Sequence, residues 1–266
     1  MHNNQNHYPS ADDRELSGEP RARKGWFITG ASTGLGLSLV KQLLVRGDQV
    51  AATTRHLQRL TDQIHSSIPT ALMRNFLPLQ LDLTDEYAIE RSIATAHRTF
   101  GRIDVVVNNA GFAPEGRMEE LSPSDIHQCF AINTTASMTV THKVMPYLQQ
   151  QRSGYILNIS SMAACAAAND SSLYAATKYA TLGLSEIEKA GAHKFNIFIT
   201  VLAPASFQPR VHARDYDMWE NIRDSDHAAT SLILLAEQPA PPPILLVGDN
   251  HIITHQKEAN EVQFIR

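Results

Sequence analysis

Short apolar runs alternate along the chain with longer segments whose apolar residues recur at helical spacing. The runs are typical of strands and cover residues 26–29, 49–53, 77–81, 103–108, 155–160, 196–202 and 244–247. Between the first two runs, small or apolar residues at positions 36, 39, 40, 43 and 44 lie on one face of a helix. Strands joined by crossover helices make a parallel sheet that is covered on both faces. We therefore predict a single doubly wound α/β domain with a mostly parallel sheet of about seven strands.

Helix signals and prolines refine this outline. Ser122 is followed by Pro123 and by Asp125, which is typical of a helix start, and this helix is expected to run to about Gln150. Pro78 lies inside the third predicted strand and weakens that assignment unless the strand begins near it. The segment PAPPP at residues 239–243 predicts an extended linker between a helix and a late strand.

Composition narrows the class of protein. With 266 residues, 43% of them hydrophobic, the chain can bury a large core, and its net charge of −4 argues against a nucleic-acid partner. Two cysteines, Cys129 and Cys165, are too few for a disulfide scaffold and favour a reducing, cytoplasmic location. Residues 1–21 are polar, without signal-peptide or membrane-spanning character. We expect them to be a mobile extension of one domain over residues 22–266, with no membrane partner.

A glycine-rich segment directly follows the first predicted strand. It reads TGASTGLG over residues 29–36 and opens the amphipathic helix. Gly30 suits a tight turn, Gly34 suits close approach of the backbone to a pyrophosphate, and Gly36 suits close packing of helix on strand. The helix N-terminus adds unpaired N–H donors for phosphates. This context favours a dinucleotide site of the Rossmann type over an ordinary glycine turn.

The end of the second predicted strand bears on the choice of dinucleotide. The segment VAATTR at residues 50–55 carries no acidic residue and ends in Arg55. A carboxylate here would bind a ribose 2′-hydroxyl, whereas an arginine attracts a 2′-phosphate. We therefore expect NADP(H) to be preferred over NAD(H), with Ser32 and Arg55 as phosphate contacts. The alternative for Arg55 is an ordinary solvated arginine.

The sharpest chemical feature is the pair Tyr174 and Lys178. Their spacing of four places the phenol and the ammonium on one face of a predicted helix. A fixed cation stabilises phenolate, so we expect Lys178 to lower the pKa of Tyr174, and a drop of three units would require about 4 kcal/mol. Such a tyrosine serves as a general acid for a carbonyl or as a general base for an alcohol. Taken alone, the pair also fits two exposed neighbours on a helix.

These segments make the chain similar to the short-chain dehydrogenase/reductase family, over residues 26–204. The resemblance extends to Asp82 in LDLTD, Asn109 in NNAG and Asn133 in AINT. It also includes Ser161, which precedes Tyr174 by the family interval of thirteen residues.

The resemblance implies a role for each of these residues. Ser161 would hold the substrate oxygen, with Ser160 as its nearest competitor, and Asn133 would kink the long helix and position a water that links the lysine to solvent. Asp82 would contact the adenine, or would instead cap a helix that begins near Asp85. Asn109 would lie against the coenzyme, or together with Asn108 would instead satisfy loop backbone groups. The expected catalytic residues are Ser161, Tyr174, Lys178 and Asn133, and the expected coenzyme contacts are Gly30, Ser32, Gly34, Leu35, Gly36, Arg55, Asp82, Asn109, Tyr174 and Lys178.

The last part of the chain departs from the family pattern. Where the family has PGxVxT, residues 204–209 read PASFQP, and the proline at 209 offers neither a hydroxyl nor an N–H to anchor the nicotinamide carboxamide. Residues 206–226 are expected to be a short substrate lid, whose aromatic side chains suit either an apolar or aromatic substrate or anchoring of the lid to the protein surface. His251 and His255 lack the acidic residue of a zinc-protease motif, so we expect no metal site.

These observations predict an NADP(H)-dependent oxidoreductase that interconverts a carbonyl and a secondary alcohol by hydride transfer. Tyr174 would be the general acid or base, and carbonyl reduction is the hypothesis for a reducing cell. The resemblance implies a homodimer or homotetramer. The alternative is a cofactor-binding regulator or scaffold of the same fold with little or no turnover, which the altered segment 204–209 favours.

Overall fold

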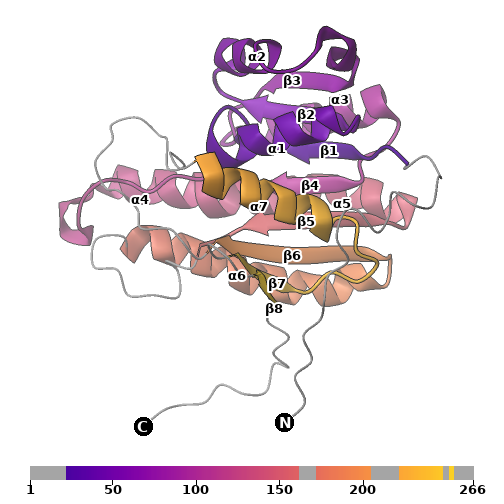
Figure 1. Ribbon diagram of the computed structural model, residues 1–266. Coiled ribbons are helices and arrows are strands. Elements are labelled where there is room, and N and C mark those ends of the chain that lie inside the picture. Colours follow the sequence, from indigo (N-terminus) through magenta and orange to yellow (C-terminus); the bar gives the residue numbers. More distant parts are fainter. Residues whose placement is uncertain (1–21, 162–171, 205–221, 248–251, 255–266) are drawn as a thin grey trace.

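One eight-stranded sheet forms the centre of the computed structural model (Figure 1), which describes residues 22–161, 172–204, 222–247 and 252–254. The strand order is β3-β2-β1-β4-β5-β6-β7-β8; the first seven strands in sequence are parallel, and β8 pairs antiparallel with β7. The strands are β1 Gly25–Ile28, β2 Gln49–Thr54, β3 Phe76–Gln80, β4 Val105–Asn108, β5 Gly154–Ile159, β6 Ile197–Pro204, β7 Ile244–Val247 and β8 Ile252–Thr254.

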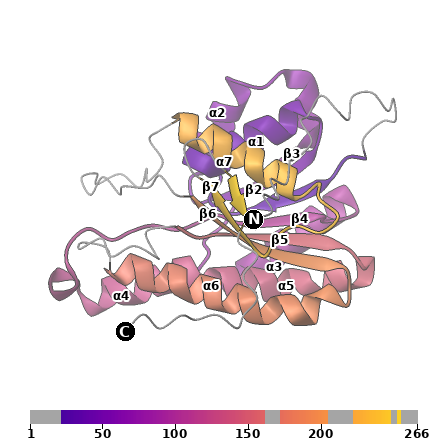
Figure 2. The same cartoon turned by 60° about the horizontal axis from the view of Figure 1, so that its bottom comes forward.

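Helices cover both faces of this sheet (Figures 1 and 2). One layer contains α1 Gly34–Val45, α2 Leu57–His65 and α7 Ile222–Leu235. The other layer contains α3 Glu86–Phe100, α4 Pro123–Phe130, α5 Ala136–Gln151 and α6 Ser172–His193. Two short 3-10 helices, η3 Thr70–Asn75 and η4 Met118–Glu120, and a π-helix, η5 Ala131–Thr135, complete the described elements.

Alternating side chains along the central strands supply both halves of the core. In β1, Trp26 and Ile28 pack with α1 and α7, whereas Phe27 lies on the opposite face with α3 and α5. Every residue of β1 and β4 is buried. Burial on both faces explains why these strands are continuous apolar runs rather than alternating ones. The predicted doubly wound, mostly parallel sheet is therefore confirmed, and β8 is an additional edge strand that we did not predict.

Ser122 and Pro78 occupy positions that suit their side-chain chemistry. Ser122 caps α4, because its side chain accepts a hydrogen bond from the Asp125 N–H while the Asp125 carboxylate accepts one from the Ser122 N–H. The predicted long helix exists as α4, η5 and α5 in succession. Pro78 lies in the middle of β3, and the strand tolerates it because β3 is at the edge of the sheet.

Some predictions fall on segments that lie outside the described residues. These are the extension at 1–21, Cys165, residues 205–209 of the departing segment, and most of the lid at 206–226. Residues 222–226, at the end of that expected lid, form the start of α7. Asp226 there accepts hydrogen bonds from Ser38 and Gln42 of α1, so this part is held against α1. Across the described segments, no helix combines the length and apolar character needed to cross a bilayer.

The connectivity determines where a ligand can bind. β1 lies between β2 and β4, so the chain reverses its direction of winding at the carboxyl ends of β1 and β4. In open parallel sheets, ligands bind in the crevice at such a switch point. The loops that follow β1, β4 and β5 carry the expected site residues, and the fold brings them to one edge of the sheet.

Candidate active site

The loops after β1 and β4 pack against each other through their glycines. Gly30 has φ +66, and a Cβ built there would lie 2.8 Å from the Ala110 Cα. A Cβ on Gly36 would lie 2.4 Å from the Gly30 carbonyl oxygen and 2.7 Å from Asn109 Nδ2. Side chains at positions 30 and 36 would therefore force the two loops apart.

Asn109 and Thr29 fasten the same two loops. Asn109 Nδ2 donates to the carbonyl oxygens of Thr29 and Gly30, both at 2.9 Å. The Thr29 hydroxyl accepts from the backbone N–H groups of Asn109 and Ala110. We did not single out Thr29 from the sequence, although it opens the glycine-rich motif. Asn109 Oδ1 is buried without a hydrogen-bond partner among the described residues, which leaves one polar atom available to a ligand at this crevice.

The start of α1 is suited to phosphate groups. Its N-cap Thr33 makes no side-chain capping bond, and the first turn contains no acidic residue. The first N–H groups of a helix have no partner within it and attract anions. Leu35 places its side chain in the core, so only its backbone is available to a ligand. Together with the unpartnered Asn109 oxygen, this arrangement fits a dinucleotide.

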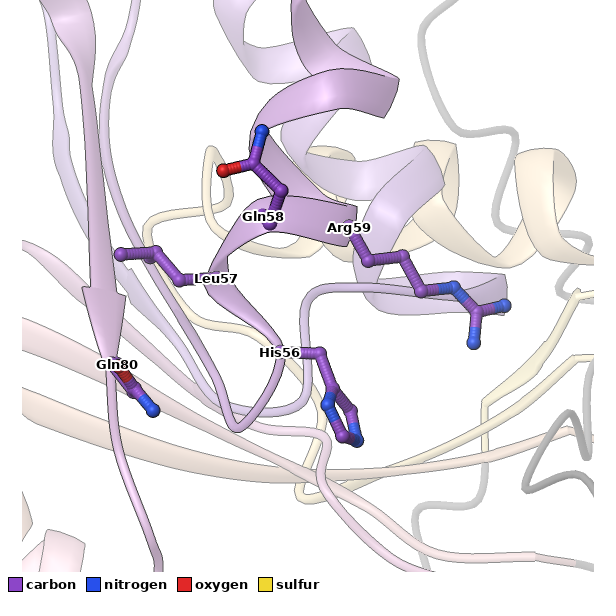
Figure 3. Close-up of a pocket in the computed structure, with 5 residues that line it drawn as sticks. All are labelled: His56, Leu57, Gln58, Arg59 and Gln80. Carbon is purple, nitrogen blue, oxygen red and sulfur yellow. The ribbon is translucent and has the colours of Figure 1, made fainter.

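The carboxyl end of β2 adds positive charge beside a cavity of about 630 Å³. Arg55 is exposed directly after the strand, as the sequence led us to expect. The cavity is lined by His56, Leu57, Gln58, Arg59 and Gln80 (Figure 3). His56 and Arg59 direct their side chains to the same side of the turn (Figure 3). We did not predict these two residues, although their proximity to Arg55 in the sequence could have indicated them.

Asp82 lies on the exposed surface after β3. Its carboxylate accepts hydrogen bonds from the Thr84 N–H and hydroxyl, at 2.9 and 2.8 Å. These bonds lower the pKa of Asp82, with a further contribution from Arg55. The alternative that Asp82 caps α3 is wrong, because Asp85 is the N-cap and accepts from the Ala88 N–H.

Ser161, Tyr174 and Lys178 form a buried cluster where β5 and α6 meet. The Ser161 hydroxyl hydrogen-bonds the Tyr174 phenol, and both residues are less than a tenth exposed. Lys178 Nζ lies over the Tyr174 ring, 5.5 Å from its centroid, and donates to the Ile159 carbonyl oxygen at 2.9 Å. Ser160, the competitor for the role of Ser161, instead donates to the Lys178 carbonyl oxygen. The structure therefore brings Ser161, and not Ser160, to the phenol.

The expected lowering of the Tyr174 pKa is wrong. Burial raises the pKa of Tyr174 above its usual value, and the Ser161 hydrogen bond opposes this only in part. Burial also lowers the pKa of Lys178 to about 8. Desolvation penalises the charged form of both groups and is the largest cause of both pKa shifts. Tyr174 is therefore held as a neutral phenol, which is a proton donor.

Asn133 joins the loop after β4 to α6. It lies in the π-helix, as expected of a residue that interrupts the long helix. Its Oδ1 accepts from the Phe112 N–H, and its Nδ2 donates to the Phe112 carbonyl and to the Thr177 hydroxyl. A Cβ on Gly111 would lie 3.2 Å from Lys178 Nζ and 3.3 Å from Asn133 Oδ1. The absence of a side chain at Gly111 therefore leaves room for Lys178 and Asn133 to approach this loop.

Cys129 is a further buried group beside this cluster. Asn133 Nδ2 lies 3.5 Å from its Sγ, and burial raises the pKa of the Cys129 thiol to about 11. A thiol with such a pKa stays protonated at neutral pH and is a poor nucleophile. Cys129 therefore fills space behind the site.

Comparison with known proteins places this site in a family. The family model for short chain dehydrogenase matches residues 24–219. The chain belongs to the short-chain dehydrogenase/reductase family. It is thus an oxidoreductase of the class that uses a nicotinamide dinucleotide.

Individual relatives agree with this family placement. Oxidoreductase BOA17 of Botryotinia fuckeliana is 36% identical over 185 residues, which cover 70% of this chain and 66% of that protein. A Haemophilus influenzae protein described as a probable NADP-dependent dehydrogenase is 34% identical over 155 residues, or 57% of this chain and 59% of that protein. The chain thus spans less than two thirds of the length of these two relatives.

A solved structure has the same architecture. The short-chain dehydrogenase from Streptomyces avermitilis superposes with a TM-score of 0.75 and 26% identity. The match covers 87% of this chain and 90% of that one. The likeness therefore extends over most of the chain.

Proposed function

We propose that this short-chain dehydrogenase is an NADP(H)-dependent oxidoreductase that interconverts a carbonyl and a secondary alcohol. The observation that carries the proposal is the buried cluster in which Ser161 hydrogen-bonds Tyr174 and the Lys178 ammonium lies over the tyrosine ring. This cluster lies at the carboxyl edge of the sheet, beside the switch point where a dinucleotide is expected.

The residues divide the chemistry among them. Ser161 holds the substrate oxygen next to the phenol, and Tyr174 gives or takes its proton. Lys178, held near Gly111 and Asn133, binds the nicotinamide ribose and supplies positive charge. A bound nicotinamide coenzyme supplies the hydride or accepts it. Asn133 keeps the loop after β4 and helix α6 at a fixed separation through its three hydrogen bonds.

The protonation state of Tyr174 favours carbonyl reduction. A general acid must hold its proton at the working pH, and burial raises the pKa of Tyr174. Alcohol oxidation requires phenolate, which the buried site disfavours. We therefore propose that the enzyme acts as a carbonyl reductase, on an apolar or aromatic carbonyl compound.

Tyr174→Phe tests the catalytic assignment. Reduction of a panel of carbonyl compounds, followed by NADPH absorbance, should fall by about a hundredfold or more, because the proton donor is lost. NADPH affinity, measured by fluorescence titration, should change little. Tyr179→Phe is the matched control, since Tyr179 is an exposed tyrosine of the same helix. Residual turnover near the wild-type rate in Tyr174→Phe would contradict the assignment.

Absence of turnover in the wild-type chain would have a different meaning. If no carbonyl or alcohol is converted while NADPH binds tightly, the chain acts as a cofactor-binding regulator rather than an enzyme. The same absorbance assay and titration therefore separate the two functions.

Arg55→Ala tests the preference for NADP(H). The proposal rests on the exposed Arg55 beside a cavity that also presents His56 and Arg59. Loss of a charge-assisted bond to a 2′-phosphate should raise the NADPH dissociation constant about tenfold or more and leave that of NADH nearly unchanged. Arg98→Ala, at an exposed arginine of α3, is the control. Equal losses for both coenzymes would remove Arg55 from the phosphate site.

A further inference from the structure

Two buried asparagines stand side by side in the interior of the sheet. Asn108 of β4 and Asn158 of β5 are paired in register and are 3% and 2% exposed. They lie on the face that α5 and α6 cover, because their strand neighbours Val106 and Ile156 pack in that core. Burying a carboxamide costs free energy unless its hydrogen bonds are made. Interior strands of a parallel sheet are otherwise apolar, so this pair requires specific partners.

The partners come from both covering helices. Asn108 Nδ2 donates to Asn158 Oδ1 at 2.8 Å and to the Thr141 hydroxyl of α5 at 3.3 Å. Asn158 Nδ2 donates to the Ser185 hydroxyl of α6 at 2.8 Å. The Ser185 hydroxyl donates a hydrogen bond to the Thr181 carbonyl oxygen, also at 2.8 Å. One chain of hydrogen bonds therefore links β4, β5 and α6.

This series of hydrogen bonds ends on the elements that carry the catalytic cluster. Ser185 follows Lys178 by seven residues, or two helical turns, so both lie on the inner face of α6. Tyr174 lies in the first turn of α6, and Ser161 follows Asn158 by three residues. Lys178 and Ser160 already make hydrogen bonds between α6 and the end of β5, and the Asn158–Ser185 bond adds a third point of fixed length and direction that opposes sliding of the helix. Any slide of α6 would separate the phenol from the serine.

We propose that Asn158 and Ser185 are positioning residues, which hold α6 in register on β5 so that Tyr174 meets Ser161. The inference rests on the proposed function, because it assigns these two residues to the same reaction. Neither residue touches the reacting atoms. A misplacement of about 1 Å at a reacting centre costs about a hundredfold in rate, so even a small slide matters.

Ser185→Ala and the double variant Asn158→Leu with Ser185→Ala provide the test. Ser185→Ala leaves Asn158 Nδ2 buried without an acceptor, so both the melting temperature and kcat should fall, with kcat down about tenfold or more. The double variant removes the unpaired Asn158 amide, and Asn108 Nδ2 keeps the Thr141 hydroxyl as an acceptor, so part of the melting temperature should return while the bond between β5 and α6 stays lost. Its kcat should stay low, and the NADPH dissociation constant should stay within about twofold of wild type.

Thr200→Val is the matched control. The Thr200 hydroxyl of β6 is buried and donates to the Pro242 carbonyl oxygen at 2.8 Å, away from α6. Its loss should lower the melting temperature and leave kcat unchanged. Recovery of kcat together with the melting temperature in the double variant would overturn the proposal, as would an equal loss of kcat in Thr200→Val.

Titration of the phenol separates this inference from the proposed function. The Ser161 hydrogen bond lowers the pKa of Tyr174, so weakening it in the double variant should shift the titration of Tyr174 to higher pH. The shift is read from tyrosinate absorbance in pH jumps faster than alkaline unfolding, after subtraction of the spectrum of the same chain with Tyr174→Phe, and this measurement needs no turnover. An inactive wild type would defeat the proposed function alone, whereas an unshifted titration would defeat the positioning role.

Discussion

At the scale of single residues, burial determines the charges of the site. Lys178 is almost fully buried, and burial lowers its pKa to about 8 from a model-compound value of 10.5. Below pH 8 the folded and unfolded chains both carry the ammonium, so the full penalty of burying it opposes folding. Between pH 8 and 10.5 the folded chain holds fewer protons than the unfolded one, so stability rises with pH, and above 10.5 the penalty is gone.

Lys178→Met should therefore stabilise the protein in a pH-dependent way. The variant should unfold at higher urea than wild type at pH 7, and its advantage should shrink by about 3 kcal/mol as the pH rises to 10.5. Urea unfolding over a pH series measures this change. Lys194→Met, at an exposed lysine, serves as the control and should show no such trend. A constant difference across the series would contradict the lowered pKa.

Prediction from the sequence reached the residues whose spacing is local or whose motif is continuous. Tyr174 and Lys178 follow from one helical turn, and the glycines follow from a strand, turn and helix in succession. His56 and Arg59 were missed because a cavity depends on how α2 stands against β3. The pKa direction at Tyr174 was wrong because it depends on burial, which residue spacing does not report.

At the scale of elements, the capping box that begins helix α4 helps to position Asn133 further along the chain. Its capping box at Ser122 fixes the start of the helix that leads into the π-helix and Asn133. The strands were predicted to within about two residues because fully buried parallel strands are continuous apolar runs. β8 was missed because it has only three residues and its pairing with β7 depends on tertiary structure.

Ser122→Ala should lower the stability of the protein by about 1 kcal/mol, because a capping hydrogen bond is lost. Urea unfolding monitored by circular dichroism gives this value. Ser124→Ala, at an exposed serine two residues further along the same helix, should have a much smaller effect. Similar losses in both variants would show that the capping bond contributes nothing specific.

At the scale of the whole molecule, exposed apolar side chains are concentrated on one helix layer. Four of the seven large hydrophobic residues that are exposed in the described part of the chain lie on α4, α5 and α6: Phe130, Met138, Tyr179 and Ile187. Ile187 is 79% exposed. Formation of the homodimer or homotetramer expected from the sequence would bury such side chains, so we propose that its contact lies on these helices.

Ile187→Asp should reduce self-association, because a carboxylate in an apolar contact must be desolvated. Sedimentation velocity at several concentrations would show the shift towards the mass of one chain. Val45→Asp is the matched control, since Val45 is 64% exposed on α1, in the other helix layer. An unchanged mass distribution in Ile187→Asp would place the contact elsewhere.

The proline in β3 also restricts how copies of this protein can join. A bare sheet edge invites backbone pairing with a neighbour, which leads to continuous intermolecular sheets and finally to fibrils. Pro78 has no N–H to offer in the middle of that edge, so a neighbouring strand would meet a gap in the hydrogen-bond ladder. Pro78→Val would restore the missing N–H donor, and we expect the variant to form insoluble aggregates more readily than the natural chain.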